Sequence, residues 1–337
     1  MNSHGLQAPK QTPSRRWQDE LRTAIRTPAE LANHLELPPD QISRHPDVLD
    51  FPIFAPRAYL SRIEPGNPND PLLKQILPLD IERTPDPADL LDPLQESQYQ
   101  LTPGLLQKYP GRALLVVNGR CAIHCRYCFR RHFPYDQTPQ ATGQWQPAVE
   151  SIAADPSIQE VILSGGDPLT MPDPALERLL DSLSQTPTVA RVRIHTRLPI
   201  AIPSRVTPEL IRLLNAARPQ IACVVHSNHP NELDAEVTEA LKRLRDSTQA
   251  VLNQAVLLAG INDHLPALVG LSERLFRAGA LPYYLHQLDP VAGARHFQVP
   301  ISRGRELVHQ MRDCLPGYLV PRYVQEIPGR LSKTILE

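Results

Sequence analysis

From residue 112 onward, short apolar runs alternate with amphipathic stretches, and this alternation constrains the fold more than any other feature of the sequence. Runs rich in Val, Ile and Leu predict buried strands, and the stretches between them have the length and periodicity of helices. Strands that alternate with helices form βαβ units and a parallel sheet. We expect strands at 113–117, 160–164, 190–196, 221–226, 250–258 and 281–288, and helices at 174–184, 208–217, 234–246 and 265–278.

Six such units fit an α/β fold with a partial or complete barrel. Active sites of barrel enzymes lie at the carboxyl ends of the strands. A single polar strand end would mean little, because loops are polar in any protein, but five strands of this chain end in this way. The clusters are SGGD (164–167), HTR (195–197), HSNH (226–229), NQ (253–254) and HQLD (286–289).

The region before residue 105 has a different texture, because the chain's 37 prolines are concentrated there. Proline interrupts helices and central strands, so this region is expected to consist of short helices and extended connectors that wrap a larger core. We therefore divide the chain into an N-terminal helical and proline-rich extension, 1–105, and a core domain, 106–337.

Two short helices are expected in this extension. Thr27 can cap the second one, with Pro28 at its first position and Glu30 completing a capping box. The first would carry Trp17, Leu21 and Ile25 on one face.

Charge and hydropathy exclude several classes of partner. Thirty-five Lys and Arg residues against 36 Asp and Glu residues leave a formal net charge of −1, so the basic footprint of a nucleic-acid-binding protein is missing. The first twenty residues contain no apolar signal segment, and no later stretch approaches the ~18 consecutive apolar residues of a membrane helix. We expect a cytoplasmic protein that binds neither nucleic acid nor membranes.

The five cysteines are an odd, clustered set, which in a reducing compartment indicates metal or redox chemistry rather than disulfides. Cys223 and Cys314 lie far from the cluster in sequence, and both are expected to be buried thiols.

Cys121, Cys125 and Cys128 form a C-x3-C-x2-C motif directly after the first apolar run. Thiolates at this spacing hold a metal ion or an iron–sulfur cluster. A structural zinc site needs four ligands, and His124 or His132 would have to supply the fourth. Three thiolates on a four-iron cluster instead leave one iron open for a substrate or cofactor.

This motif resembles that of the radical S-adenosylmethionine (SAM) enzymes, in which the open iron of a [4Fe-4S] cluster binds SAM. The resemblance implies a radical SAM partial (β/α)6 barrel. It also implies that the glycine-rich segment after the second strand binds SAM. That segment comprises Ser164, Gly165, Gly166 and Asp167.

A narrower resemblance, to the lysine 2,3-aminomutase family, extends from about residue 50 to the end of the chain. It rests on YPGRALLVVNGRCAIHCRYCFRR, VILSGGDPL, HSNHPNEL, LNQAVLLAGIND, HQLDPVAGARHF and IPGRLSK, in this order. It implies that pyridoxal 5′-phosphate (PLP) and a SAM-derived 5′-deoxyadenosyl radical convert L-lysine to β-lysine. An external one-electron reductant and assembly as a homo-oligomer are implied as well.

The family's site residues map onto this chain one by one. Lys333 matches the lysine that forms the Schiff base with PLP. Arg130 matches the arginine that binds the substrate carboxylate, and Asp289 matches one of two aspartates that bind the substrate ammonium. Glu326 stands at the second aspartate position and keeps its charge. The positions near PLP are Tyr109, Arg112 and Gln254.

Three functions remain open at this point. The chain ends four residues after Lys333, and residues 302–329 resemble the branch of the family that makes (R)-β-lysine for a ligase that modifies elongation factor P. The second function is an aminomutase of general lysine or β-lysine metabolism. The third is a scaffold that binds a cluster or zinc without turnover.

Overall fold

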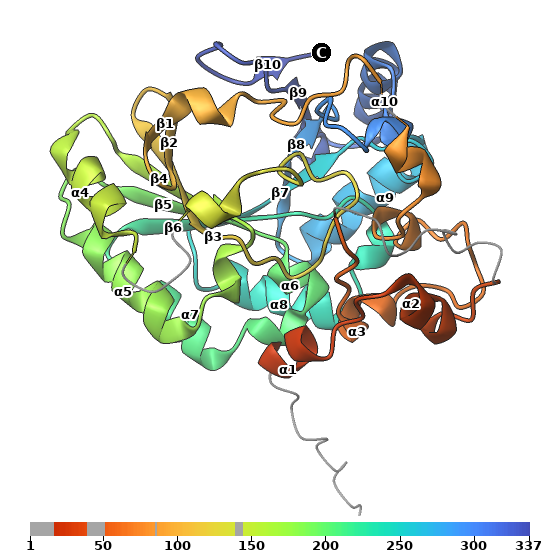
Figure 1. Cartoon of the computed structure of the whole chain (residues 1–337), viewed down its shortest axis with the longest axis horizontal. Helices are drawn as coiled ribbons and strands as arrows, with labels where there is room; N and C mark the ends of the chain where they lie inside the picture. Colours follow the sequence, from red (N-terminus) through yellow and green to blue (C-terminus); the bar gives the residue numbers. More distant parts are fainter. Residues whose placement is uncertain (1–16, 39–50, 85, 139–143) are drawn as a thin grey trace, which may run out of the picture.

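The computed structural model describes residues 17–38, 51–84, 86–138 and 144–337. Within these residues the strands form one ten-stranded sheet whose order follows the sequence (Figure 1). The seven strands β3 to β9 are parallel; the antiparallel strands β1 and β2 precede them at one end of the sheet, and β10 pairs antiparallel with β9 at the other. The described first and last strands do not pair, so the barrel is partial. The strands are β1 (Gln100–Thr102), β2 (Leu105–Tyr109), β3 (Arg112–Asn118), β4 (Glu160–Gly165), β5 (Arg191–Thr196), β6 (Gln220–Val225), β7 (Ala250–Val256), β8 (Leu281–His286), β9 (Arg322–Gln325) and β10 (Thr334–Ile335).

All six predicted strands are confirmed, as β3 to β8. Their apolar runs form the interior: β4 is buried along its whole length, and Cys223 in β6 is fully buried as expected. The parallel strand β9, with the sequence RYVQ, was not predicted.

Helices follow one another around the outside of the curved sheet (Figure 1). The four predicted helices are confirmed as α5, α7, α8 and α9, while α4 and α10 were not predicted. Helices α7 and α8 begin at side-chain caps: Thr207 accepts the Leu210 N–H at 3.1 Å, and Asp234 accepts the Val237 N–H at 2.8 Å. The helices are α1 (Trp17–Arg22), α2 (Pro28–His34), α3 (Arg57–Leu60), α4 (Gln146–Ala154), α5 (Asp173–Ser184), α6 (Leu198–Ala201), α7 (Pro208–Ala216), α8 (Ala235–Arg245), α9 (Leu265–Arg277) and α10 (Ile301–Cys314).

The predicted cap of α2 is confirmed, because the Glu30 N–H donates to the Thr27 hydroxyl at 3.2 Å. The Glu30 carboxylate, however, accepts the N–H of Arg26 rather than that of Thr27. Helix α1 ends at Arg22, and Ile25 instead forms a β-bridge with Ala55.

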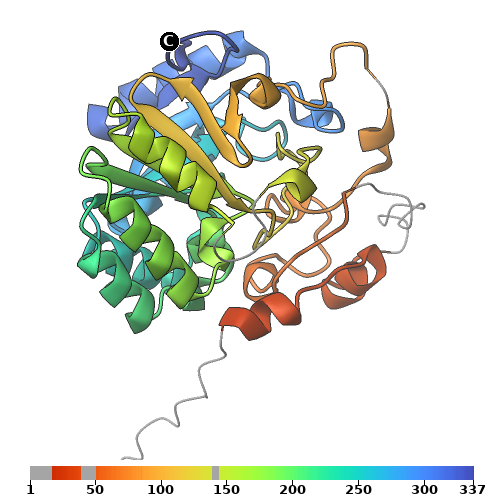
Figure 2. The same ribbon diagram turned by 60° about the vertical axis from the view of Figure 1, so that its left-hand side comes forward.

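The N-terminal region packs on the barrel. Its buried residues, including Leu31, Tyr59 and Leu72, belong to the same apolar core as the interior of the barrel. From α3 the chain runs up one side of the molecule to β1 (Figure 2). The division at 105/106 remains a proposal, and this point lies inside β2, which pairs with β3 and so ties the extension to the core.

Cys314 corrects a prediction, because its side chain is exposed and not buried. It is the last residue of α10, and its thiol donates to the Gln310 carbonyl at 3.2 Å. The inward stripe of α10 ends at Met311, and Leu315, beyond the helix, takes the next buried position.

Among the described residues, no helix has both the length and the apolar character needed to cross a membrane.

Candidate active site

A cavity of about 440 Å³ opens inside the barrel, and each of the five polar strand ends contributes to its wall. It extends from the loops at the carboxyl ends of the strands to the first residues of β3 and β9. All predicted site residues line it, so the structure brings together segments that lie more than 200 positions apart in sequence. They are Tyr109, Arg112, Cys121, Cys125, Cys128, Arg130, Ser164, Gly165, Gly166, Asp167, Gln254, Asp289, Glu326 and Lys333.

The cysteine loop leaves β3 and lies against the glycine-rich loop that leaves β4. The carbonyl of Asn118 accepts the Gly166 N–H at 2.8 Å, and the carbonyl of Arg120 accepts the Asp167 N–H at 2.6 Å. A Cβ atom on Gly166 would lie 2.2 Å from the Arg120 carbonyl oxygen. Glycine is therefore required for the two loops to meet.

The three thiols of Cys121, Cys125 and Cys128 lie half-buried in the cavity wall. Burial, together with the neighbouring thiols, raises the pKa of Cys121 and raises the pKa of Cys128 to about 11. Three thiolates so placed need a compensating positive charge, which a metal centre supplies.

The residues considered as a fourth zinc ligand are engaged elsewhere. His124 Nδ1 pairs with the Pro52 carbonyl at 2.8 Å, and the His124 ring stacks on Phe51. His132 Nε2 pairs with the Ala292 carbonyl at 3.3 Å. In the described part of the chain, no three His, Cys, Asp or Glu side chains are grouped as around a single metal ion.

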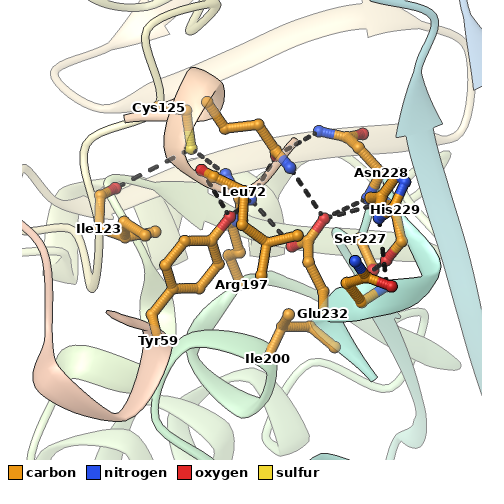
Figure 3. Close-up of polar contacts among 12 residues, drawn as sticks. Tyr59, Leu72, Ile123, Cys125, Arg197, Ile200, Ser227, Asn228, His229 and Glu232 are labelled. Atoms are coloured by element: carbon orange, nitrogen blue, oxygen red, sulfur yellow. Dashed lines mark hydrogen bonds and ion pairs between the residues drawn. The ribbon is translucent and has the colours of Figure 1, made fainter. Parts of the chain in front are cut away.

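Arg197, from the HTR cluster at the end of β5, contacts Cys125 of the cysteine loop (Figure 3). Its Nη1 donates to Cys125 Sγ at 2.5 Å and to the Tyr127 hydroxyl at 2.6 Å. Its Nη2 donates to Gln75 Oε1 at 2.7 Å and to Glu232 Oε2 at 2.9 Å. Arg197 thus ties Cys125 of the cysteine loop to the buried polar side chains of Tyr127, Gln75 and Glu232.

The carboxylate of Asp167 is satisfied within the protein. It accepts hydrogen bonds from the Thr196 hydroxyl and from the backbone N–H groups of Leu169, Arg197 and Leu198, at 2.7 to 3.0 Å. Burial nevertheless raises the pKa of Asp167 to about 6. Its side chain therefore fixes the glycine-rich loop in place and leaves the backbone of the loop to face the cavity.

Arg130 is buried beside this loop, and its guanidinium is held on three sides. Its Nε and Nη2 donate to the two carboxylate oxygens of Glu96 at 2.7 and 2.8 Å. Its Nη1 donates to the Ser164 hydroxyl at 2.9 Å. The rings of Phe129 and Phe133 lie against the guanidinium. The predicted carboxylate-binding group thus touches the predicted SAM-binding loop.

The acidic part of the cavity contains Glu326 and Asp289. Glu326 follows β9 and accepts from Lys333 Nζ at 2.5 Å and from Lys108 Nζ at 3.0 Å. These two ammonium groups outweigh burial and lower the pKa of Glu326 to about 2. Burial, and next the charge of Glu326, raise the pKa of Asp289 to about 7. Glu326 is therefore ionised at neutral pH, whereas the pKa of Asp289 lies close to neutral pH.

The remaining predicted residues lie around Lys333 and the start of β3. Lys333 stands before β10 on the hairpin that follows Glu326, and its Nζ lies over the Tyr284 ring at 5.9 Å. The Arg112 guanidinium lies over the Tyr109 ring at 5.0 Å, and Gln254 Nε2 is 2.9 Å from His226 Nε2.

Sequence reasoning missed several residues of this site, above all Glu96 and Lys108 in the cavity wall and Gln75 and Glu232 behind it. Glu232 lies within the HSNHPNEL segment that carries the family resemblance but was given no role there, and the sequence around the other three residues contains no comparable signal.

The radical SAM superfamily matches residues 115–269 of the chain. The chain is 44% identical to the L-lysine 2,3-aminomutase of Escherichia coli (strain K12) over 97% of its own length and 96% of that protein. It is 42% identical to the enzyme of the same name from Haemophilus influenzae, covering 95% of each. It is 38% identical to that of Acetoanaerobium sticklandii, covering 94% of this chain and 77% of that one. The chain therefore belongs to the lysine 2,3-aminomutase family of the radical SAM superfamily and is an isomerase that uses an iron–sulfur cluster, SAM and PLP.

Proposed function

We propose that this chain converts L-lysine to (R)-β-lysine by moving the α-amino group to the β-carbon. One observation carries the proposal: a single cavity is lined by three cysteines, a glycine-rich loop, a buried arginine, and two acids beside a lysine. The acids argue for a substrate with a distal cation, because a desolvated ammonium needs matching negative charge. A relative specific for glutamate would be expected to have basic or neutral groups at these two positions.

The residues at the carboxyl ends of β3 and β4 fit a cluster and SAM. Cys121, Cys125 and Cys128 would hold the [4Fe-4S] cluster. Its irons would compensate the negative charge of thiolates that burial makes costly to form in the absence of a metal centre. The loop from Ser164 to Asp167 would contact SAM, with Gly166 permitting close backbone approach. When bound and reduced by an external donor, the cluster and SAM supply the radical that starts the reaction.

The residues around Lys333 fit PLP. Lys333 would hold PLP covalently, and Tyr109, Arg112 and Gln254 would contact it, with Arg112 supplying a cation suited to the phosphate. When bound, PLP stabilises the electron-rich and radical states of the migrating amino group. The reductant can be any one-electron donor of sufficiently low potential.

The side chains of the protein bind and orient the substrate between these groups. Arg130 would take the carboxylate of lysine, and Asp289 with Glu326 would take its distal ammonium. The partly apolar wall excludes water from the reacting atoms, which strengthens both ion pairs.

Lysine binding should strengthen as the pH rises from about 6 to about 8. The pKa of Asp289 is raised to about 7, so its side chain is neutral below that pH and negative above it, whereas the distal amine of lysine remains protonated up to a pKa of ~10.4. Asp289→Asn should flatten the pH dependence of KM and weaken binding by ~1 to 3 kcal/mol. A variant whose pH profile matches that of the wild type would show that Asp289 does not face the ammonium.

The proposal is tested by anaerobic incubation of the reconstituted enzyme with L-lysine, SAM, PLP and a reductant, followed by chiral chromatography of the product. We expect (R)-β-lysine. The (S) product would refute the stereochemical part, and cleavage of SAM without β-lysine would refute the choice of substrate.

We further propose that this β-lysine is made in the cytoplasm for a ligase that attaches it to elongation factor P. The support is the resemblance of residues 302–329 to that branch of the family, and the alternative is general lysine or β-lysine metabolism. Deleting the gene in a host that carries the ligase should lower the mass of elongation factor P by one lysyl adduct, and added (R)-β-lysine should restore it. An unchanged mass would favour the alternative.

A further inference from the structure

The most informative unassigned residue in the cavity is Glu96, which lies in the short helix η5 (Glu96–Tyr99) before the barrel. Its side chain is 3% exposed and lines the cavity. Its two oxygens bind Nε and Nη2 of Arg130 as a fork, the most directional arrangement available to this pair of groups. Its ionised form is stable there because Arg130 and Lys108 outweigh burial and lower the pKa of Glu96.

This ion pair leaves one edge of Arg130 facing the cavity. Nε and Nη2 are occupied by Glu96, whereas Nη1 donates to the Ser164 hydroxyl, which a ligand oxygen can replace. A carboxylate that enters the cavity can therefore reach Arg130 at the Nη1 edge, next to the glycine-rich loop.

A second cation, Lys108, lies beside Glu96 and links it to Glu326. Lys108 Nζ lies 3.3 Å from the Glu96 carboxylate and 3.0 Å from that of Glu326. The positive charges of Arg130 and Lys108 are thus matched by the negative charges of Glu96 and Glu326. Glu96 is held from two sides, by the guanidinium of Arg130 and by the ammonium of Lys108, which keeps its carboxylate in a fixed position in the cavity wall.

A purely structural role explains this arrangement poorly. Buried ion pairs cost desolvation free energy that apolar side chains of similar volume avoid. Here both partners, Glu96 and Arg130, lie in the wall of a cavity. Helix η5 also contacts the hairpin that carries Lys333, since the Gly329 N–H donates to the Tyr99 hydroxyl at 2.8 Å. The helix thus contacts the two segments that carry Arg130 and Lys333.

We propose that Glu96 is a positioning residue that orients Arg130 so that its Nη1 edge receives the substrate carboxylate, and that this sets the preference for a free amino acid. The inference rests on the role of Arg130 in the proposed function. If Glu96 orients Arg130 in this way, the enzyme should bind L-lysine more tightly than L-lysinamide, in which an amide replaces the carboxylate.

The test is anaerobic calorimetric titration of the oxidised holoenzyme, which does not turn over, with L-lysine and with L-lysinamide. The wild type should bind L-lysine more tightly than L-lysinamide. In Glu96→Gln the ratio of the two affinities should fall roughly tenfold, with little change in the affinity for L-lysinamide. Glu209→Gln, the same change at an exposed glutamate of α7, is the matched control and should retain the preference. Equal weakening of both ligands in Glu96→Gln, or an undiminished preference, would overturn the inference.

Glu96→Asp provides a second variant if Glu96→Gln folds poorly. It keeps the charge but is too short to hold both nitrogens, so it should lose part of the preference, and a full wild-type preference would overturn the inference. A wild-type enzyme that does not distinguish the two ligands would instead refute the role of Arg130 in the proposed function.

Discussion

Replacing Cys121, Cys125 or Cys128 with alanine should each remove the brown iron–sulfur chromophore and abolish SAM cleavage. Each thiol would hold a different iron, and no other cysteine of the described chain lines the cavity. The measurements are the visible absorbance and iron content of the reconstituted protein, and 5′-deoxyadenosine formation under anaerobic reduction.

Cys223 and Cys314 provide matched controls. Cys223 is buried in β6, and Cys314 is exposed at the end of α10, so alanine at either position should leave both the cluster and SAM cleavage intact. A full cluster in any one of the first three variants would contradict the assignment of the ligands.

Replacing Lys333 with alanine should abolish covalent PLP binding and all lysine conversion, while the cluster remains. The cluster and Lys333 lie on separate segments, and Glu326 keeps Lys108 as a partner, so the loss of one ammonium should not unfold the hairpin. The measurements are the absorbance of lysine-bound PLP and the site of attachment after borohydride reduction and peptide mapping.

Lys242→Ala, on the outer helix α8, is the control for this prediction and should bind PLP normally. PLP trapped on Lys242 or on any lysine other than Lys333 would contradict the assignment.

The sequence predicted the barrel because the strands that form it are runs of buried aliphatic residues. Strand β9 escaped prediction because RYVQ is short and only its two central residues are buried. Cys314 was misassigned because its burial was expected without an element to place it: it is the last residue of α10, a helix that was not predicted, and its side chain is exposed. Hydrophobic patterns with a period of two or 3.6 residues therefore identify buried strands and helices reliably, but short, partly exposed strands and the ends of helices less well.

The candidate site was predictable where its residues belong to local motifs. The three cysteines, the glycine-rich loop and Lys333 each lie in a short segment with a recognisable pattern, and the structure brings these segments to one cavity. Their supporting residues come from far away in sequence. Glu96 lies 34 positions from Arg130, and Gln75 lies 122 positions from Arg197. Such partners follow from the path of the proline-rich segment over the barrel, which no local pattern specifies.

We propose that the enzyme moves the α-nitrogen of lysine to the neighbouring carbon within one molecule. It is tested most directly by supplying L-lysine with a heavy isotope at its α-nitrogen, together with SAM, PLP and a reductant under anaerobic conditions, and locating the label by mass spectrometry. We expect β-lysine that retains the label in full on its β-carbon. Label that remains on the α-carbon, or is released as ammonia, would contradict it.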